Sequence, residues 1–176
     1  MSEIVQSLAI WTVLTALLAA AIHLGIVLAI PHVVGYRLRS MAPRNKVFHT
    51  PKPTAAYNPI RRASPDLIYS ACPYNLSAGP LRVTAPASGT YMSVSCFASN
   101  TDNFYVRNDR HLDALFDFIL VGPGTPQPDA LGTDVVRSPT TAGGIIFRYF
   151  VGDGTHEEQI EKIRNKIRIA RLDRDE

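Results

Sequence analysis

Residues 90–107 read TYMSVSCFASNTDNFYVR, and they contain two candidate strands separated by a turn. Side chains along the first strand alternate in two interleaved sets, Tyr91-Ser93-Ser95-Phe97 and Met92-Val94-Cys96. A period of two residues is typical of a β-strand. The polar cluster at residues 100–103 is rich in Asn and Asp, which favour turns. This stretch therefore predicts a strand, a turn and a second strand.

The same texture extends on both sides, from residue 64 to residue 151. The candidate strands are Leu67–Tyr74, Leu81–Ala85, Thr90–Ala98, Phe104–Arg107, Phe116–Val121, Val135–Arg137 and Ile145–Val151. Turn residues separate them, including the Gly-containing stretches at residues 77–80, 87–89, 122–124 and 142–144. Many short strands divided by turns favour a β-sandwich or a barrel. The fold class predicted for this region is mainly β.

The C-terminal segment has a helical pattern. Residues 155–158 read THEE, a capping-box sequence that is typical of a helix start. Ile160, Ile163, Ile167 and Ala170 follow at helical spacing and form one apolar stripe. We expect an amphipathic helix that packs this stripe on its own domain, although a basic helix lying on a membrane is an alternative.

The N-terminal segment from Ile4 to Ile30 is apolar throughout, and no Asp, Glu, Lys or Arg lies between Glu3 and Arg37. About 20 apolar residues suffice to span a bilayer as a helix. A cleavable signal peptide is the alternative, but a basic N-terminal region is missing and the apolar run continues past Ala19–Ala21. The pattern favours an uncleaved transmembrane anchor, with Pro31 ending or kinking the helix near Ile30.

The segment that follows is rich in proline and basic residues and contains no acidic residue. We interpret it as an extended linker near the membrane surface. The predicted organisation is an anchor at 1–36, a linker at 37–63 and a β-sandwich domain ending in a helix at 64–176. The basic residues after the apolar run place the C-terminal domain in the cytoplasm if the positive-inside rule is applied literally.

Composition excludes several classes of protein. The chain has 176 residues, 18 basic and 15 acidic, and the net charge of +3 does not indicate a nucleic-acid partner. The two cysteines, Cys72 and Cys96, exclude a disulfide-dense scaffold and a zinc cluster of cysteines alone. A disulfide between them is possible if the domain is periplasmic and their strands adjoin. The residues predict no cofactor and no metal site.

Two groups of residues have the composition of a chemical site. Asp109, His111 and Asp113 alternate and would share one face of a strand, as metal ligands can, but the segment is more typical of a polar surface loop. Ser70, His111 and Asp102 contain the residue types of a catalytic triad. No local motif supports that triad, and such triples occur by chance in a protein of this size.

Six segments, in order, are similar to a bacterial family known as domain of unknown function 1254. They are PDLIYS (65–70), YNLSAGP (74–80), GTYMSV (89–94), TDNF (101–104), LVGPG (120–124) and VRSPT (136–140). The chain resembles a short, membrane-anchored branch that lacks the second domain of longer members, domain of unknown function 1214. The resemblance implies a jelly-roll β-sandwich, a companion protein carrying the second domain, and a place in the bacterial inner membrane with the globular domain in the periplasm.

Together these patterns predict a single-pass envelope protein whose sandwich is a binding or assembly module. Its apolar docking face is expected on Ile145–Phe150 or on the isoleucine stripe of the final helix. The alternative is a hydrolase or lyase acting on a small polar envelope substrate. Its site would be the polar residues within the matching segments, where Arg137 would bind a carboxylate or phosphate. These residues are Tyr69, Ser70, Tyr74, Asn75, Asn103 and Arg137.

Overall fold

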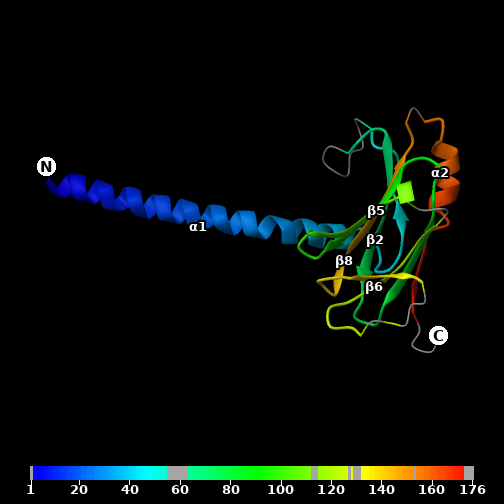
Figure 1. Ribbon diagram of the computed structural model, residues 1–176. Coiled ribbons are helices and arrows are strands. Elements are labelled where there is room, and N and C mark those ends of the chain that lie inside the picture. The colour runs from blue at the N-terminus through cyan, green and yellow to red at the C-terminus, as the bar shows by residue number, and fades with distance from the viewer. Residues whose placement is uncertain are drawn as a thin grey trace.

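The protein consists of one long helix followed by nine short strands and a second, short helix (Figure 1). The computed structural model describes residues 2–54, 63–111, 115–126, 128, 132–152 and 154–172. The elements are α1 (Ser2–Ser40), β1 (Phe48–His49), β2 (Leu67–Asn75), β3 (Leu81–Pro86), β4 (Met92–Ala98), β5 (Asn103–Asn108), the 3₁₀ turn η1 (Asp109–His111), β6 (Leu115–Val121), β7 (Asp134–Arg137), β8 (Ala142–Phe150), α2 (Glu157–Arg164) and β9 (Arg168–Arg171).

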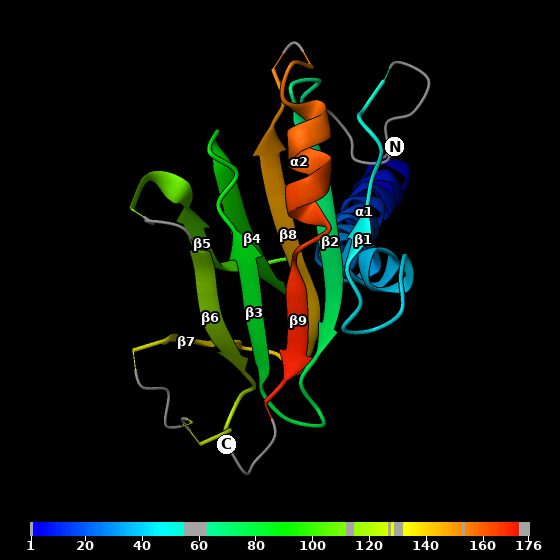
Figure 2. The ribbon, with the colours of Figure 1, turned by 90° about the vertical axis from the view of Figure 1, so that its right-hand side faces the viewer.

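The strands form two sheets. Sheet A has the order β1-β2-β8-β4-β5, and sheet B has the order β7-β6-β3-β9. Figure 2 shows β6, β3 and β9 of sheet B in front of the strands of sheet A. All pairings are antiparallel except that of β6 with β7. The mainly β fold with an N-terminal helix is therefore confirmed, whereas the jelly-roll path of the chain stays a prediction.

The core lies between the two sheets. Alternate residues of β8, namely Ile145, Phe147 and Tyr149, are fully buried there. Val83 of β3 and Phe118 of β6 are among the core residues from sheet B. Because successive side chains of a strand point to opposite faces, Gly144, Ile146, Arg148 and Phe150 lie on the outer face of sheet A.

The seven predicted strands all form, but the predicted turn at residues 142–144 does not. These residues begin β8, and Gly143 pairs with Tyr74 of β2. A Cβ atom at Gly143 would overlap the carbonyl oxygen of Phe97 and the hydroxyl of Tyr74. The glycine is therefore explained by the close approach of its neighbours within a strand, and not by a turn.

The C-terminal helix is confirmed, but it ends at Arg164, whereas the apolar stripe predicted a helix as far as Ala170. It begins at Glu157 with His156 as N-cap and no side-chain capping bond, so the capping box from Thr155 is not its start. Ile160 is buried and Ile163 packs against the core. Ile167 and Ala170 lie beyond the helix, because residues 168–171 form β9 and pair with the edge of β3. The spacing of Ile167 and Ile169 fits a strand as well.

The N-terminal helix is longer than predicted. It continues through Pro31 to Ser40, so of the two predicted effects of Pro31, an end or a kink near Ile30, the end is wrong. Proline is better tolerated in membrane helices than in soluble ones. Its length and apolar composition suffice to cross a bilayer, which is consistent with an anchor. Within the predicted linker, Phe48 and His49 form β1 and pair with Ala71 and Ser70 of β2.

Candidate functional site

The end of α1 is attached directly to the outer face of sheet A. A Cβ atom at Gly35 would overlap the carbonyl oxygen of Ser99, and the Nη1 atom of Arg39 donates a hydrogen bond to that same oxygen at 2.9 Å. Leu38 covers Gly144, where an added Cβ atom would lie 3.2 Å from the leucine Cδ2 atom. At position 35, only a residue without a side chain allows α1 to come this close to the Ser99 carbonyl oxygen. The helix therefore leaves the sandwich as a fixed arm, across the direction of the strands (Figure 1).

A groove of about 560 Å³ runs along this junction. Its volume falls within the range of small-molecule sites in proteins, about 300–1,000 Å³. Half of its lining residues have apolar side chains, three are glycines, and Arg37 and Arg39 are its charged members. The lining residues are Val34, Gly35, Arg37, Leu38, Arg39, Met41, Phe97, Ala98, Thr101, Gly143, Gly144 and Ile146.

The helical wall of the groove and the chain that follows it carry only positive charges. Between Glu3 and Asp66 the sequence has no acidic residue, and Arg37, Arg44 and Lys46 are exposed. Arg39 is half-buried because its guanidinium contacts Ser99. This end of the molecule therefore attracts anionic groups.

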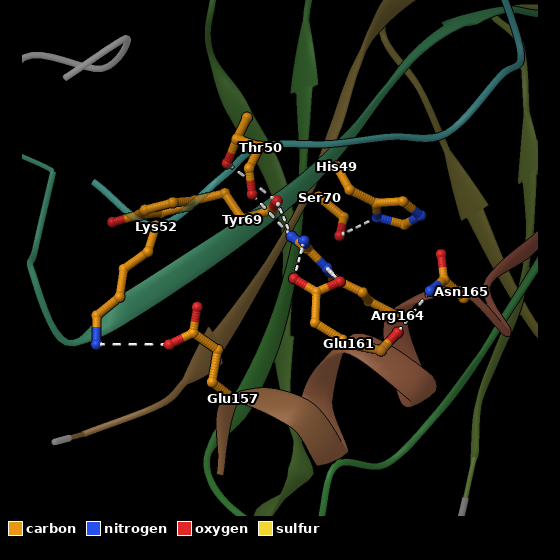
Figure 3. A network of polar contacts seen from close by, with 9 residues as sticks. All are labelled: His49, Thr50, Lys52, Tyr69, Ser70, Glu157, Glu161, Arg164 and Asn165. Carbon is orange, nitrogen blue, oxygen red and sulfur yellow. Dashed lines mark hydrogen bonds and ion pairs between the residues drawn. The ribbon is translucent and has the colours of Figure 1, made fainter. Parts of the chain in front are cut away.

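A second candidate is the buried polar network beneath α2 (Figure 3). Arg164 is 6% exposed, and its Nε atom donates to the carboxylate of Glu161 at 2.7 Å. Its Nη1 atom donates to the carbonyl oxygens of Thr50 at 2.8 Å and Tyr69 at 3.4 Å. One guanidinium thus joins α2, the segment after β1 and strand β2. A buried cation paired in this way holds three segments together.

His49 lies next to this arginine. Its Nδ1 atom is 2.7 Å from the hydroxyl oxygen of Ser70, which is fully buried. Burial lowers the pKa of His49, and the positive charge of Arg164 lowers it further, against a smaller opposite effect of Glu161. The imidazole is therefore neutral at pH 7. Burial raises the pKa of Tyr149, whose buried hydroxyl lies near Ser70 and has no hydrogen-bond partner among the described residues.

This network is built for cohesion rather than for catalysis. A histidine beside a serine has the residue types of an activated nucleophile, but a nucleophile must reach its substrate. Ser70 is fully buried, and neither it nor His49 lines the groove at the junction. The network instead fastens the chain that follows the anchor to the sandwich.

None of the six predicted site residues lines the groove, and the hydrogen bonds of five of them go to different partners. The hydroxyls of Tyr69 and Tyr74 bind the Ser64 amide at 3.3 Å and Ser138 Oγ at 2.8 Å, respectively. Asn75 exchanges two hydrogen bonds with Asn45. The guanidinium of Arg137 donates to the carbonyl oxygens of Gly122 and Thr125. Asn103 is exposed at the start of β5, and Ser70 binds His49. A binding role for the six stays a prediction.

The two alternatives weighed from the sequence gain no geometric support. Asp109 accepts a hydrogen bond from the Met92 amide, and Asp102 accepts one from Asn100. Residues 112–114 and the side chain of residue 111 lie outside the described part of the chain. Within that part, no three His, Cys, Asp or Glu side chains cluster as metal ligands do.

Cys72 and Cys96 are free and buried. Both are register partners of Ile145, from opposite sides of β8. Two strand spacings separate their Cα atoms by about 9–10 Å, which is too far for a disulfide. Burial raises the pKa of the Cys72 thiol to about 12 and also raises that of Cys96, with a smaller contribution from Cys72. Both thiols are therefore unreactive at neutral pH.

Neither expected apolar docking face is available as a whole. Phe147 is fully buried between the sheets, and Ile163 packs against the core. The outer face of sheet A instead exposes Tyr91, Val106 and Phe150, at 45%, 62% and 41% of their surface. We call these three residues the exposed apolar triad. The Phe150 amide donates to the Tyr91 carbonyl at 2.9 Å, so the two aromatic residues are neighbours.

Comparison with protein families settles the family of the chain. A family model described as "Protein of unknown function (DUF1254)" matches residues 44–171. The chain belongs to the DUF1254 family. The part of the chain that the family model covers begins before β1 and ends with β9, so it includes both sheets and α2. No curated protein is significantly similar to the chain.

One solved structure shows the same fold in a longer chain. The crystal structure of the VPA0106 protein from Vibrio parahaemolyticus matches this DUF1254 protein with a TM-score of 0.59 at 13% identity. The match covers 74% of this chain but only 31% of the Vibrio chain. An uncharacterized protein from Burkholderia cenocepacia matches with a TM-score of 0.47 at 14% identity, over 84% of this chain and 41% of that one. The chain thus spans less than half the length of these structures.

Sequence reasoning missed the residues that build the junction and the network. In the sequence Gly35 falls within the predicted anchor, Arg39 within the predicted linker and Arg164 on the predicted basic helix. A glycine near the end of an apolar helix is a weak signal of close packing. No signal in the sequence links Arg164 to Thr50, because the two residues are 114 positions apart.

Proposed function

We propose that this protein is a single-pass inner-membrane protein whose sandwich is an assembly module. It pairs with a companion protein that carries the remaining part of the longer relatives, domain of unknown function 1214. The sandwich faces the periplasm.

The observation that carries this proposal is the coverage of the Vibrio structure. The shared fold accounts for 31% of that chain, so most of it has no counterpart in these 176 residues. A domain that occurs as one part of a longer protein commonly shares an interface with the other part. Our proposal is that a separate protein occupies the corresponding interface here.

The fixed junction supports pairing at the membrane. Because Gly35 and Arg39 hold α1 against Ser99, the sandwich keeps one orientation relative to its anchor. The outer face of sheet A is then turned toward the bilayer and the side from which α1 leaves. A companion with its own anchor meets the sandwich at the same height above the membrane, which raises the effective concentration of the pair.

The exposed apolar triad is the surface that we assign to the companion. Tyr and Phe are enriched at the centres of protein interfaces, where they bury large areas with few rotatable bonds. Val106 is more exposed than the core residues of its own sheet and lies on β5, an edge strand. An edge strand beside exposed aromatic residues is a common site of association.

The hydrolase or lyase alternative has no comparable support. Five of the six polar residues proposed for it lie on β2 and β5 of sheet A and the sixth on β7 of sheet B, and most are hydrogen-bonded to neighbouring segments. A catalytic site needs convergent groups with access for substrate. We therefore do not advance it as a second function.

The test is recovery of the tagged, full-length protein from native membranes, with mass spectrometry of the proteins that come with it. We expect a stoichiometric companion carrying domain of unknown function 1214. The Phe150→Asp variant should lose this companion while remaining folded. Leu115→Asp is the matched control, since Leu115 is 44% exposed on sheet B and lies outside the triad. Recovery of the wild-type chain alone, folded and monomeric, would refute the proposal.

A further inference from the structure

The groove at the junction lies where the anchor leaves the membrane. Val34, the first lining residue, follows the end of the apolar run at Ile30 by four residues, which is about 6 Å along a helix. The headgroup layer of a bilayer is about 5–8 Å thick on each side of the hydrocarbon. The groove therefore opens at the level of the lipid headgroups of one leaflet.

The shape and lining of the groove suit a hydrocarbon chain. Val34, Leu38 and Met41 form one wall from α1, and Phe97 and Ile146 belong to the opposite wall from sheet A. Two glycines, Gly143 and Gly144, lie in strand β8 at its floor. An apolar lining at this depth is stabilised when hydrocarbon replaces water.

The rim carries positive charge suited to a phosphate. Arg37 lines the groove and its side chain is exposed. Arg39 also lines the groove and donates one bond to Ser99, which positions its guanidinium at the rim. Arginine binds phosphate oxygens through several parallel hydrogen bonds. With Arg44 and Lys46 nearby, the local field favours an anionic headgroup over a zwitterionic one.

We propose that the groove binds one anionic phospholipid, with an acyl chain between α1 and sheet A and its phosphate on Arg37 and Arg39. The site is separate from the exposed apolar triad, so it goes beyond the proposed pairing with a companion and does not depend on it. A bound lipid would fill the junction and strengthen the attachment of the sandwich to its anchor.

The experiment uses the full chain in phosphatidylcholine nanodiscs. The probe is a phosphatidylglycerol with a photoreactive diazirine on one acyl chain, and its choline counterpart serves for comparison. Cross-linked peptides are located by mass spectrometry. We expect labelling of the membrane span and, in addition, of the peptides containing Phe97 or Ile146. The glycerol lipid should label these two peptides about fivefold more than the choline lipid, the effect of roughly one basic residue at a membrane surface.

Three variants and one matched control test the groove itself. Ile146→Trp fills the groove and should abolish labelling of the sandwich peptides while leaving that of the span. Leu115→Trp, at an exposed residue of sheet B outside both the groove and the triad, is the matched control. Met41→Glu places a charge in the same groove and should likewise abolish labelling of the sandwich peptides. Met41 is 51% exposed, so the protein tolerates this substitution. Arg37→Gln should remove most of the preference for the glycerol headgroup.

Two results would overturn the proposal. Labelling confined to residues 4–30 in the wild-type protein would show that no acyl chain enters the groove. Equal labelling of the sandwich by both lipids would show that the arginines do not select a charged headgroup. Either result leaves the recovery of a companion unaffected, so the failure of this site and the failure of the pairing are distinguishable.

Discussion

At the scale of single residues, a few positions join the anchor to the sandwich. Gly35 allows α1 to reach the backbone at Ser99, and Arg39 adds a hydrogen bond to the same carbonyl. Arg164 ties the next segment of the chain to α2 and β2. Each of these residues acts through a contact with a residue that is distant in the sequence. Their substitution should therefore alter the attachment before it alters the fold.

Gly35→Ala should loosen the junction. The added methyl group overlaps the Ser99 carbonyl, and overpacking of this kind costs about 1–3 kcal/mol. We expect trypsin to cleave the chain after Arg44 or Lys46 at least about fivefold faster in the variant, as a change of 1 kcal/mol implies. Gly25→Ala is the control, because nothing lies within 4 Å of a Cβ atom there. Equal cleavage rates in both variants would contradict a fixed junction.

His49 should make stability depend on pH. Burial lowers its pKa below the ordinary value of 6.5, so the unfolded chain binds the proton more readily than the folded one. The contribution of the neutral imidazole is complete above pH 6.5 and is lost as the pH falls from there toward the folded-state pKa. We expect Tm to fall between pH 7.5 and pH 5. The His49→Asn variant, measured alongside, should show a smaller fall; an unchanged fall would assign the effect to other groups.

At the scale of elements, strand β8 separates the core from the outer surface by simple alternation. Phe147 faces the core and is fully buried, whereas Phe150 faces outward and is 41% exposed. A docking face composed of the whole segment Ile145–Phe150 is therefore impossible, because half of its side chains belong to the core. Only the outward half is available to a partner.

Phe147→Asp should unfold the sandwich. Loss of a buried phenylalanine costs about 3–5 kcal/mol, and a buried carboxylate adds to that, against a typical total stability of about 5–15 kcal/mol. Phe150→Asp should change the free energy of unfolding by only about 0.5 kcal/mol, as surface substitutions do. Thermal unfolding followed by circular dichroism distinguishes the two. A folded Phe147→Asp protein would contradict the placement of this side chain in the core.

At the scale of the whole molecule, the charges that flank α1 bear on the side of the membrane on which the sandwich lies. The basic residues after α1 favour the cytoplasm under the positive-inside rule. That rule weighs short loops most strongly, and large folded domains translocate largely regardless of charge. Our proposal places the sandwich in the periplasm for this reason and because of the family resemblance.

An introduced cysteine can test this placement. The native thiols are buried and have raised pKa values, so they should not react with a membrane-impermeant maleimide. In cells with a permeabilised outer membrane, Ser77→Cys should be labelled and Ser2→Cys should not, until the inner membrane is lysed. Both positions are exposed. The opposite pattern would place the sandwich in the cytoplasm.

Much of the fold was predictable from local pattern. Each strand from β2 to β8 was expected from alternation and turn residues, and α1 from an unbroken apolar run. Local pattern was less reliable where two periods coincide. Ile163 and Ile167 fit a helix, yet Ile167 and Ile169 fit a strand, and the unpaired edge of β3 decided in favour of the strand. Gly143 was read as a turn residue because its partners, Phe97 and Tyr74, are distant in sequence.

The amino-acid sequence by itself determined the division into an apolar helix and a β-rich domain, because hydrophobic periodicity acts between near neighbours. It also carried the family resemblance, since short motifs in a fixed order survive without the structure. Only the tertiary structure decided what lies against what: the contact of Gly35 with Ser99, the network around Arg164, the separation of the cysteines by β8, and the groove. Those features depend on contacts between residues far apart along the chain, and no local pattern records them.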